Sequence, residues 1–165
     1  MSHIGDPIEI AAKNWRAAGW GDAADGMALV TGVVRAQQLL VAGVERRLRP
    51  LGLTFARFEV LRLLAFSRRG ALPMGVVGQR LQVHPASVTS AVDRLESDGL
   101  VTRMRSEHDG RRVLVALTTK GHGVVDAATV ALNDLFANLP LTDGDIATAN
   151  ELLARLRGAP GVEDL

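Results

Sequence analysis

A chain of 165 residues, of which 47% are apolar, is long enough to bury the core of one compact domain or one two-lobed unit. It contains no cysteine, which excludes disulfides, thiolate metal sites and cysteine-based redox sensing. No uninterrupted apolar run reaches the roughly 18 residues of a membrane span, and residues 1–10 do not read as a signal peptide. We therefore expect a cytoplasmic protein with no membrane partner.

Two helices are predicted in the first 50 residues. Asp6 is a suitable N-cap, Pro7 suits the first helical position and Gly19 ends this helix. A second, long helix runs from about residue 22 to residue 49, where Pro50 ends it. Its apolar residues recur at spacings of three and four, which suits packing against another helix, including one from a second subunit.

Three shorter helices are predicted next. Thr54 can cap the first of them, which continues to about residue 66. The second is expected over residues 72–81. The third begins at Pro85, a favoured first position, and Gly99 closes it as a left-handed cap.

Two strand-like runs, residues 100–105 and 111–118, follow the third short helix and are joined by a polar loop with an Asp-Gly turn signal. Thr118 can cap a further helix to about residue 138. Thr142 can start a last helix that ends at Gly158.

This order of elements predicts a mainly α fold with a small β-hairpin wing (α+β). Three short helices followed by a hairpin make a winged helix-turn-helix core, and the outer helices make a helical dimerisation lobe. We expect residues 1–50 to form the N-terminal part of that lobe, residues 51–117 the DNA-binding lobe, and residues 118–165 the C-terminal dimerisation helices.

The third short helix carries a face of small polar side chains. Ser87, Ser90 and Arg94 line this face, with Ala86 and Thr89 beside them. A helix must come close to base edges to read the major groove, and small hydroxyl-bearing side chains permit this. The ordinary alternative is an amphipathic helix whose outer face is merely polar.

Positive charge gathers around this helix although the net charge is only +1. Residues 57–120 contain 11 basic and 6 acidic side chains, whereas residues 121–165 contain 2 basic and 7 acidic ones. Arg111 and Arg112 in the hairpin loop can enter a minor groove, and Arg103 and His84 can contact phosphates. Two elements suited to two adjacent grooves predict double-stranded DNA as the partner.

The segment LQVHPASVTSAVDRLESDGLVTRMRSEHDGRRVLVALTTKG, residues 81–121, closely resembles the winged-helix core of the MarR family of bacterial transcriptional regulators. The resemblance lies in SVTSAVDRLESDGLV, in the Asp-x-Arg of Asp109 and Arg111, and in LTTKG, and the helix order agrees over about residues 30–156. It implies a homodimer on a pseudo-palindromic operator, with Arg111 in the minor groove and Asp109 holding the wing. The residues that it places toward the major groove are Ser87, Thr89, Ser90 and Arg94.

The same resemblance implies a small-molecule effector, anionic or aromatic, that releases a repressor from DNA. Its site would lie between the dimerisation lobe and the DNA-binding lobe. The candidate ligand-binding residues are Trp15, Trp20, Arg35, Arg57, Glu59 and Arg62. The alternative for each is an aromatic residue of the core or an arginine in a structural ion pair.

Other function classes find little support in the sequence. There is no glycine-rich phosphate loop and no H-E-x-x-H site, and the four histidines are scattered, so we expect no enzyme activity, metal or cofactor. One alternative stays open, a winged-helix protein-interaction or dimerisation module without specific DNA binding. Such a module would not need arginines on the wing or small residues on the helix face.

Overall fold

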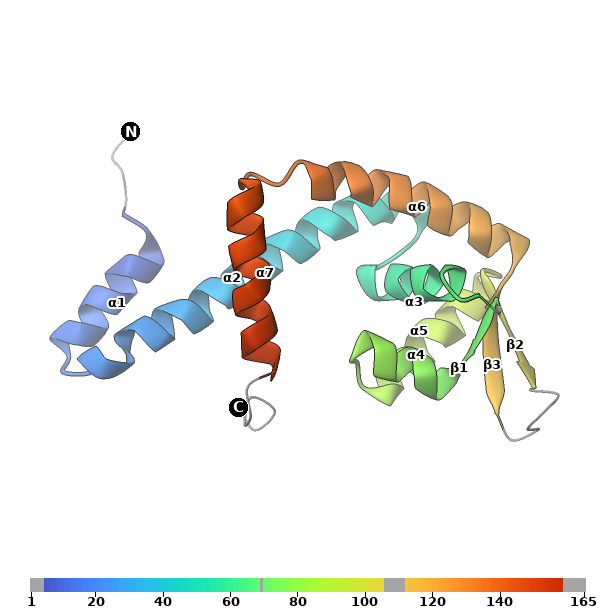
Figure 1. Cartoon of the computed structure of the whole chain (residues 1–165), viewed down its shortest axis with the longest axis horizontal. Coiled ribbons are helices and arrows are strands. Elements are labelled where there is room, and N and C mark those ends of the chain that lie inside the picture. Colours follow the sequence, from blue (N-terminus) through green and yellow to red (C-terminus); the bar gives the residue numbers. More distant parts are fainter. Residues whose placement is uncertain (1–4, 69, 106–111, 159–165) are drawn as a thin grey trace. The chain divides into compact units, whose positions relative to one another are not determined.

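The computed structural model describes residues 5–68, 70–105 and 112–158. The mainly helical fold with a small sheet confirms the predicted fold class (Figure 1). The chain forms two compact units, residues 1–132 and residues 133–165. Its elements are α1 (Pro7–Ala17), α2 (Gly21–Leu48), the 3-10 turn η1 (Arg49–Leu51), α3 (Phe55–Ala65), β1 (Ala71–Pro73), α4 (Met74–Leu81), α5 (Pro85–Ser97), β2 (Val101–Arg105), β3 (Val113–Leu117), α6 (Thr119–Ala137) and α7 (Asp143–Gly158).

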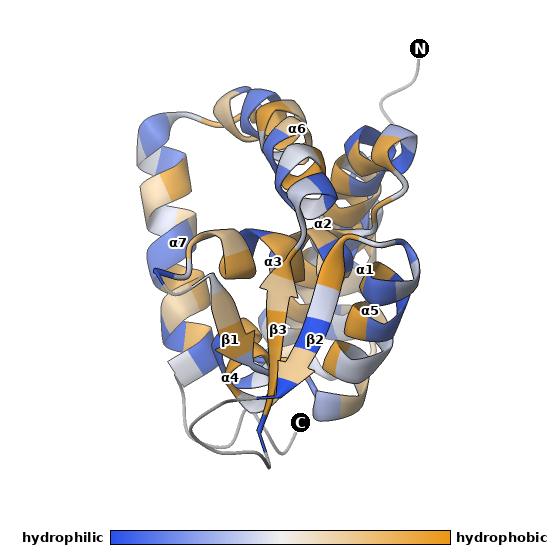
Figure 2. Cartoon of the chain, turned by 90° about the vertical axis from the view of Figure 1, so that its right-hand side faces the viewer, coloured by the Kyte–Doolittle hydropathy of each residue, from blue (hydrophilic) through white to orange (hydrophobic). Residues whose placement is uncertain are grey.

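A three-stranded antiparallel sheet lies in the first unit, with the strand order β1–β3–β2 (Figure 2). β2 and β3 pair as the predicted hairpin. The prediction of a helix from residue 72 is wrong at its start, because Leu72 pairs with Val115 in β1 and α4 begins only at Met74. Pro73 is in an extended conformation, with φ −61° and ψ 141°, so the chain leaves the strand and enters the helix without a loop.

Aliphatic side chains from α3, α4, α5 and the sheet form the winged-helix core. The fully buried ones are Val60, Leu61, Leu64, Val77, Val92, Leu95 and Val115. The expected cap of α5 is present: Gly99 has a φ of 71°, and the N–H of Leu100 donates to the C=O of Leu95 at 2.9 Å. Leu100 is buried by this turn, which brings the chain directly from α5 into β2.

The first part of α6 packs against this core. The N–H of Gly121 donates to Oγ1 of Thr118 at 3.0 Å, so Thr118 is the predicted cap. Gly121 is buried, and a Cβ built on it would stand 2.0 Å from the carbonyl oxygen of Leu100. Only glycine therefore allows the helix to start this close to the end of the α5 turn. Val125, Ala128 and Leu132 continue the buried face of α6.

The helices α1 and α2 form an antiparallel hairpin that leaves many apolar side chains exposed. Asp6 caps α1 as predicted, since its Oδ1 accepts the N–H of Ile8 at 3.0 Å. Only three of the 28 residues of α2 are buried, Ala24, Val44 and Leu48. The exposed large apolar residues of α2 are Leu29, Val30, Val34, Leu39 and Leu40.

The expectation that no segment would qualify as a membrane span needs correction for α2. By length and composition alone, the helical segment of residues 21–51 is long and apolar enough to cross a membrane. The search for an uninterrupted apolar run missed it because Arg35 divides the stretch between Asp25 and Glu45, within which it is the one charged residue.

The second unit contains the end of α6 and the helix α7. Thr142 and Asp145 form the predicted reciprocal cap. The N–H of Thr142 donates to Oδ2 of Asp145 at 3.1 Å, and the N–H of Asp145 donates to Oγ1 of Thr142 at 3.2 Å. No residue of α7 is buried.

Candidate nucleic-acid interface

The buried face of α5 fixes which of its side chains reach solvent. Val88, Val92 and Leu95 are almost completely buried, so the helix cannot rotate about its axis without exposing them. Ser87, Ser90 and Arg94 are exposed, as the sequence predicts for a face that meets DNA. The hydroxyl groups of the two serines have no hydrogen-bond partner among the residues that the structure describes, so they remain available to a ligand.

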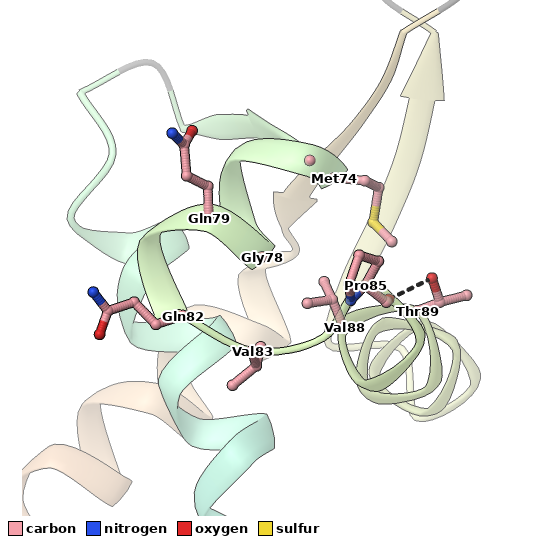
Figure 3. A pocket seen from close by; sticks show the side chains of 9 residues that line it. Met74, Gly78, Gln79, Gln82, Val83, Pro85, Val88 and Thr89 are labelled. Carbon is pink, nitrogen blue, oxygen red and sulfur yellow. Dashed lines mark hydrogen bonds between the residues drawn. The ribbon is translucent and has the colours of Figure 1, made fainter. Parts of the chain in front are cut away.

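Two other predicted contacts near the start of α5 are engaged within the chain. Nδ1 of His84 accepts the N–H of Ala86 at 3.2 Å, which makes this histidine the N-cap of the helix. Oγ1 of Thr89 donates to the carbonyl oxygen of Pro85 at 3.1 Å (Figure 3). Both side chains are nevertheless exposed, and the Thr89 methyl group remains free for an apolar contact.

A hollow of about 400 Å³ lies at the turn between α4 and α5 (Figure 3). Gln82 makes this turn in the left-handed conformation, with φ 53°, and Gly78 packs so closely that a Cβ on it would stand 3.3 Å from Val88. Met74, Val83 and Pro85 give the hollow an apolar lining, and no charged side chain among the described residues lines it. Among the described residues, the hollow therefore offers no positive charge to hold a phosphate.

The described parts of the β2–β3 hairpin carry exposed arginines next to the loop that joins the two strands. Arg105 at the end of β2 and Arg112 just before β3 are both exposed. The predicted minor-groove residue Arg111 and its neighbour Asp109 lie outside the described residues.

Arg103 on β2 is held by two carboxylates of α5. Its Nη1 lies 2.5 Å from Oε2 of Glu96 and its Nη2 lies 2.5 Å from Oδ1 of Asp93. Its backbone N–H also donates to Oε1 of Glu96 at 3.1 Å. Partial burial lowers the pKa of Arg103, but hydrogen bonds and charge interactions with the two carboxylates outweigh it and raise the pKa overall. The guanidinium group therefore fastens the wing to α5.

Comparison with known proteins decides the family. The sequence model of the MarR family matches residues 51–112 of this chain. The solved structure of Sco5413, a MarR family transcriptional regulator from Streptomyces coelicolor, is 42% identical with a TM-score of 0.75, and the match covers 84% of this chain and 96% of that chain. The chain belongs to the MarR family.

Other relatives agree with this assignment. A mutant of MarR from E. coli, solved in complex with operator DNA, is 27% identical, with a TM-score of 0.69 and coverage of 81% of this chain and 96% of that chain. BpsR from Bordetella bronchiseptica, whose DNA binding is regulated by 6-hydroxynicotinic acid, is 26% identical, with a TM-score of 0.70 and coverage of 77% and 91%. The chain spans only 47% and 60% of the length of the first two curated relatives, both transcriptional regulators.

The residues predicted to bind a ligand in this MarR-family chain fall into separate groups. Trp15 and Trp20 face each other at the α1–α2 turn, with ring centroids 5.2 Å apart. Arg35 donates to Oε1 of Gln38 at 3.1 Å on α2.

Glu59 and Arg62 lie on α3, and Arg62 reaches α6. Nη1 of Arg62 donates to Oγ1 of Thr129 at 3.0 Å, and its guanidinium carbon stands 4.4 Å from the ring centroid of Phe66. Its buried Nε has no hydrogen-bond partner among the described residues. Burial raises the pKa of Glu59, whose carboxylate has no hydrogen bond or ion pair in the described part of the chain.

Arg57, the remaining predicted ligand residue, lies toward α5. Its Nη1 is 3.3 Å from Oδ2 of Asp98, and Nε of Arg94 is 3.5 Å from the same oxygen. Sequence reasoning missed the partners Asp93, Glu96 and Asp98, although all three lie on or next to α5. The sequence did contain a signal for the Arg103 contacts. Asp93 and Glu96 are three positions apart, so they lie on one side of the helix, and Arg103 follows on the next strand.

Proposed function

We propose that this protein is a sequence-specific DNA-binding transcriptional regulator that acts as a homodimer on a pseudo-palindromic operator. The exposed face of α5, with the free hydroxyl groups of Ser87 and Ser90 beside Arg94, carries the proposal. Hydroxyl and guanidinium groups can bond to base edges in the major groove, and the buried face of α5 fixes their direction. MarR of E. coli, a relative, has been solved on operator DNA.

The wing would hold the adjacent minor groove. Arg105 at the end of β2 and Arg112 just before β3 are exposed, and Arg111 would be the residue that enters the groove. Arg103 would act indirectly. Asp93 stands on the exposed side of α5, where an unpaired carboxylate would repel phosphates, and Arg103 neutralises it.

A second copy of the chain would cover the exposed apolar residues of α2. Soluble monomers rarely expose a long apolar face, and two-fold homodimers are the commonest assemblies. The dimer would place two α5 helices about one DNA turn apart, roughly 34–36 Å, for binding to successive half-sites. In this proposal residues 51–117 bind DNA, and the helices on either side form the dimerisation lobe.

The dimer would act as a repressor in the cytoplasm that a small anionic or aromatic molecule releases from DNA. Within the described residues, Nε of Arg62 has no hydrogen-bond partner and the partly buried carboxylate of Glu59 is unpaired, so a ligand could engage both groups. The regulation of BpsR by an aromatic carboxylic acid supports this class of ligand. Trp15 and Trp20 would report binding by a change in fluorescence.

Selection of duplexes from a random DNA library with the purified protein tests the proposal. We expect enrichment of a sequence with two inverted half-sites, and we expect Ser90→Leu to abolish preference for it while leaving the melting temperature unchanged. A protein that enriches no sequence, and that binds all duplexes alike, would instead be a winged-helix interaction module.

A further inference from the structure

A second hollow, of about 620 Å³, lies between the start of α3 and the exposed face of α5. Thr54 and Arg57 line one wall, and Ser87, Ser90 and Arg94 line the other. Unlike the apolar hollow between α4 and α5, this one has a guanidinium group on each side. No carboxylate lines it among the residues that the structure describes.

Both arginines are paired with a single carboxylate outside the lining. Nη1 of Arg57 and Nε of Arg94 approach the same oxygen, Oδ2 of Asp98, at 3.3 and 3.5 Å. One negative charge therefore faces two positive charges, which leaves a local charge of +1. Nε of Arg57 also donates to Oγ1 of Thr54 at 3.3 Å, and its side chain is only 17% exposed, so this guanidinium group has a fixed position.

Many hydrogen-bond donors around the hollow are still unused. A guanidinium group has five N–H donors. The contacts described for Arg57 use its Nε and Nη1, and the contact described for Arg94 uses only its Nε. The hydroxyl groups of Ser87 and Ser90 add further donors. A positively charged hollow with free donors on two walls is suited to a singly charged group with several acceptor oxygens.

We propose that this hollow binds one phosphate of the DNA backbone, with Arg57 and Arg94 donating to its oxygens. The proposal rests on the proposed DNA-binding function and adds to it Arg57, from a helix that precedes the helix-turn-helix pair. The hollow opens beside Ser90, on the side of α5 proposed to enter the major groove, and backbone phosphates border such a helix. Asp98 holds the two guanidinium groups when DNA is absent.

Arg57→Gln tests the contact, with Arg46→Gln as the matched control for loss of one exposed arginine outside the hollow. A phosphate contact carries no sequence information, so Arg57→Gln should weaken operator and non-operator duplexes by a similar factor, about ten-fold or more for a charged hydrogen bond. The slope of log affinity against log salt should fall by about 0.9 for each phosphate lost, roughly two for a dimer. Arg46→Gln should retain wild-type affinity and slope.

Asp98→Asn separates a phosphate contact from a merely structural ion pair. This variant breaks the same ion pair as Arg57→Gln but raises the charge of the hollow. We expect it to bind both duplexes at least as tightly as wild type. A loss as large as that of Arg57→Gln would show that the pair only supports the fold, and it would overturn the proposal.

A scan of the operator with single neutral methylphosphonates locates the phosphate. A methylphosphonate at one position in each half-site should weaken operator binding by wild type but should not weaken binding by Arg57→Gln any further. Arg57→Gln could instead keep the operator affinity and the salt slope of wild type while Ser90→Leu still loses its sequence preference. This result would overturn the phosphate site but leave the proposed function standing. Inorganic phosphate could also stabilise wild type but not Arg57→Gln, while both proteins bind the operator with the same affinity. The hollow would then be a small-anion site, and the proposal would be overturned. A wild-type protein that binds no duplex would remove both proposals.

Discussion

The winged-helix region and the outer helices have similar amounts of leucine and valine but bury them very differently. In residues 53–117, side chains such as Leu61, Leu64 and Leu95 are at most 1% exposed. On α2 the corresponding side chains are open, with Leu39 75% and Leu40 55% exposed. The first region completes its own core, whereas α2 presents apolar side chains that the described part of its own unit leaves exposed.

This difference separates two tasks of one sequence. The winged-helix region needs a rigid core because α5 must hold its polar face in one orientation. The apolar residues of α2 contribute little to the stability of one chain, since the free energy of burial scales with the area removed from water. In the proposed homodimer they would gain this stabilisation by being buried against a second copy.

The largest effect is expected from truncating a core leucine. Leu95→Ala should lower the free energy of unfolding by about 2–5 kcal/mol, because it leaves a cavity between α5 and the sheet. Within a single chain, Leu39→Ala should cost roughly 0.5 kcal/mol or less, since three quarters of Leu39 is exposed, and any larger loss would come from its covering by a second copy. Urea unfolding of both variants measures the contrast. Equal losses would mean that α2 is as well buried in solution as the winged-helix core.

Two glycines of α6 test where the winged-helix core ends. Gly121→Ala should destabilise by about 1–3 kcal/mol or more, because its Cβ would stand 2.0 Å from the carbonyl oxygen of Leu100. A Cβ at position 123 would meet no atom within 4 Å, so Gly123→Ala should stabilise the helix by roughly 0.5–1 kcal/mol. Thermal unfolding of the two variants should therefore move in opposite directions. A similar change in both would show that α6 does not start against the α5 turn.

Much of this fold follows from local sequence signals. Asp6, Thr54, Thr118 and Thr142 all cap helices where the sequence predicts them, because a cap depends on residues only a few positions away. Strand β1 was missed for the opposite reason. Its three residues carry no periodicity of their own and become a strand only by pairing with β3, more than 40 positions later.

The candidate site divides in the same way. The polar face of α5 follows from helical periodicity and the buried partners of that helix. The partner of Arg57 depends on a tertiary contact across the 41 positions to Asp98, which no local pattern specifies. The partners of Arg103 lie only 7 and 10 positions away, at Glu96 and Asp93. The family resemblance placed Arg57 among the candidate ligand residues, whereas in the structure Arg57 and Arg94 share the carboxylate of Asp98.

A charge placed on α2 should break the proposed covering of its apolar face. Leu29, Val33, Ala36 and Leu40 follow one another at helical spacing, so Leu40→Asp would bring a carboxylate into an interface formed there. We expect the dissociation constant of the dimer to rise roughly a hundred-fold, since a buried unpaired charge costs several kcal/mol.

Gln38→Asp is the matched control for Leu40→Asp, because it adds the same charge on the opposite side of the helix. Analytical ultracentrifugation should show dimers of the 17.6 kDa chain for wild type and for Gln38→Asp, and monomers for Leu40→Asp at low concentration. Dimers of equal strength for all three proteins would show that this face of α2 is not an interface.

The smallest expected effect concerns Glu59, a charge that the winged-helix region keeps partly buried without a partner. Burial raises its pKa in the folded protein above the ordinary value of 4.5, so the folded state binds this proton more tightly than the unfolded state. The stabilising contribution is complete below pH 4.5 and is lost as the pH rises through the folded pKa. At pH values above the folded pKa, burial of the charged carboxylate destabilises the fold. Glu59→Gln should raise the melting temperature slightly at neutral pH, and this gain should shrink as the pH falls toward 4.5.

Glu151→Gln, on the exposed helix α7, should show no such gain. A difference between Glu59→Gln and wild type that stays constant across this pH range would rule out burial of the Glu59 charge as its cause.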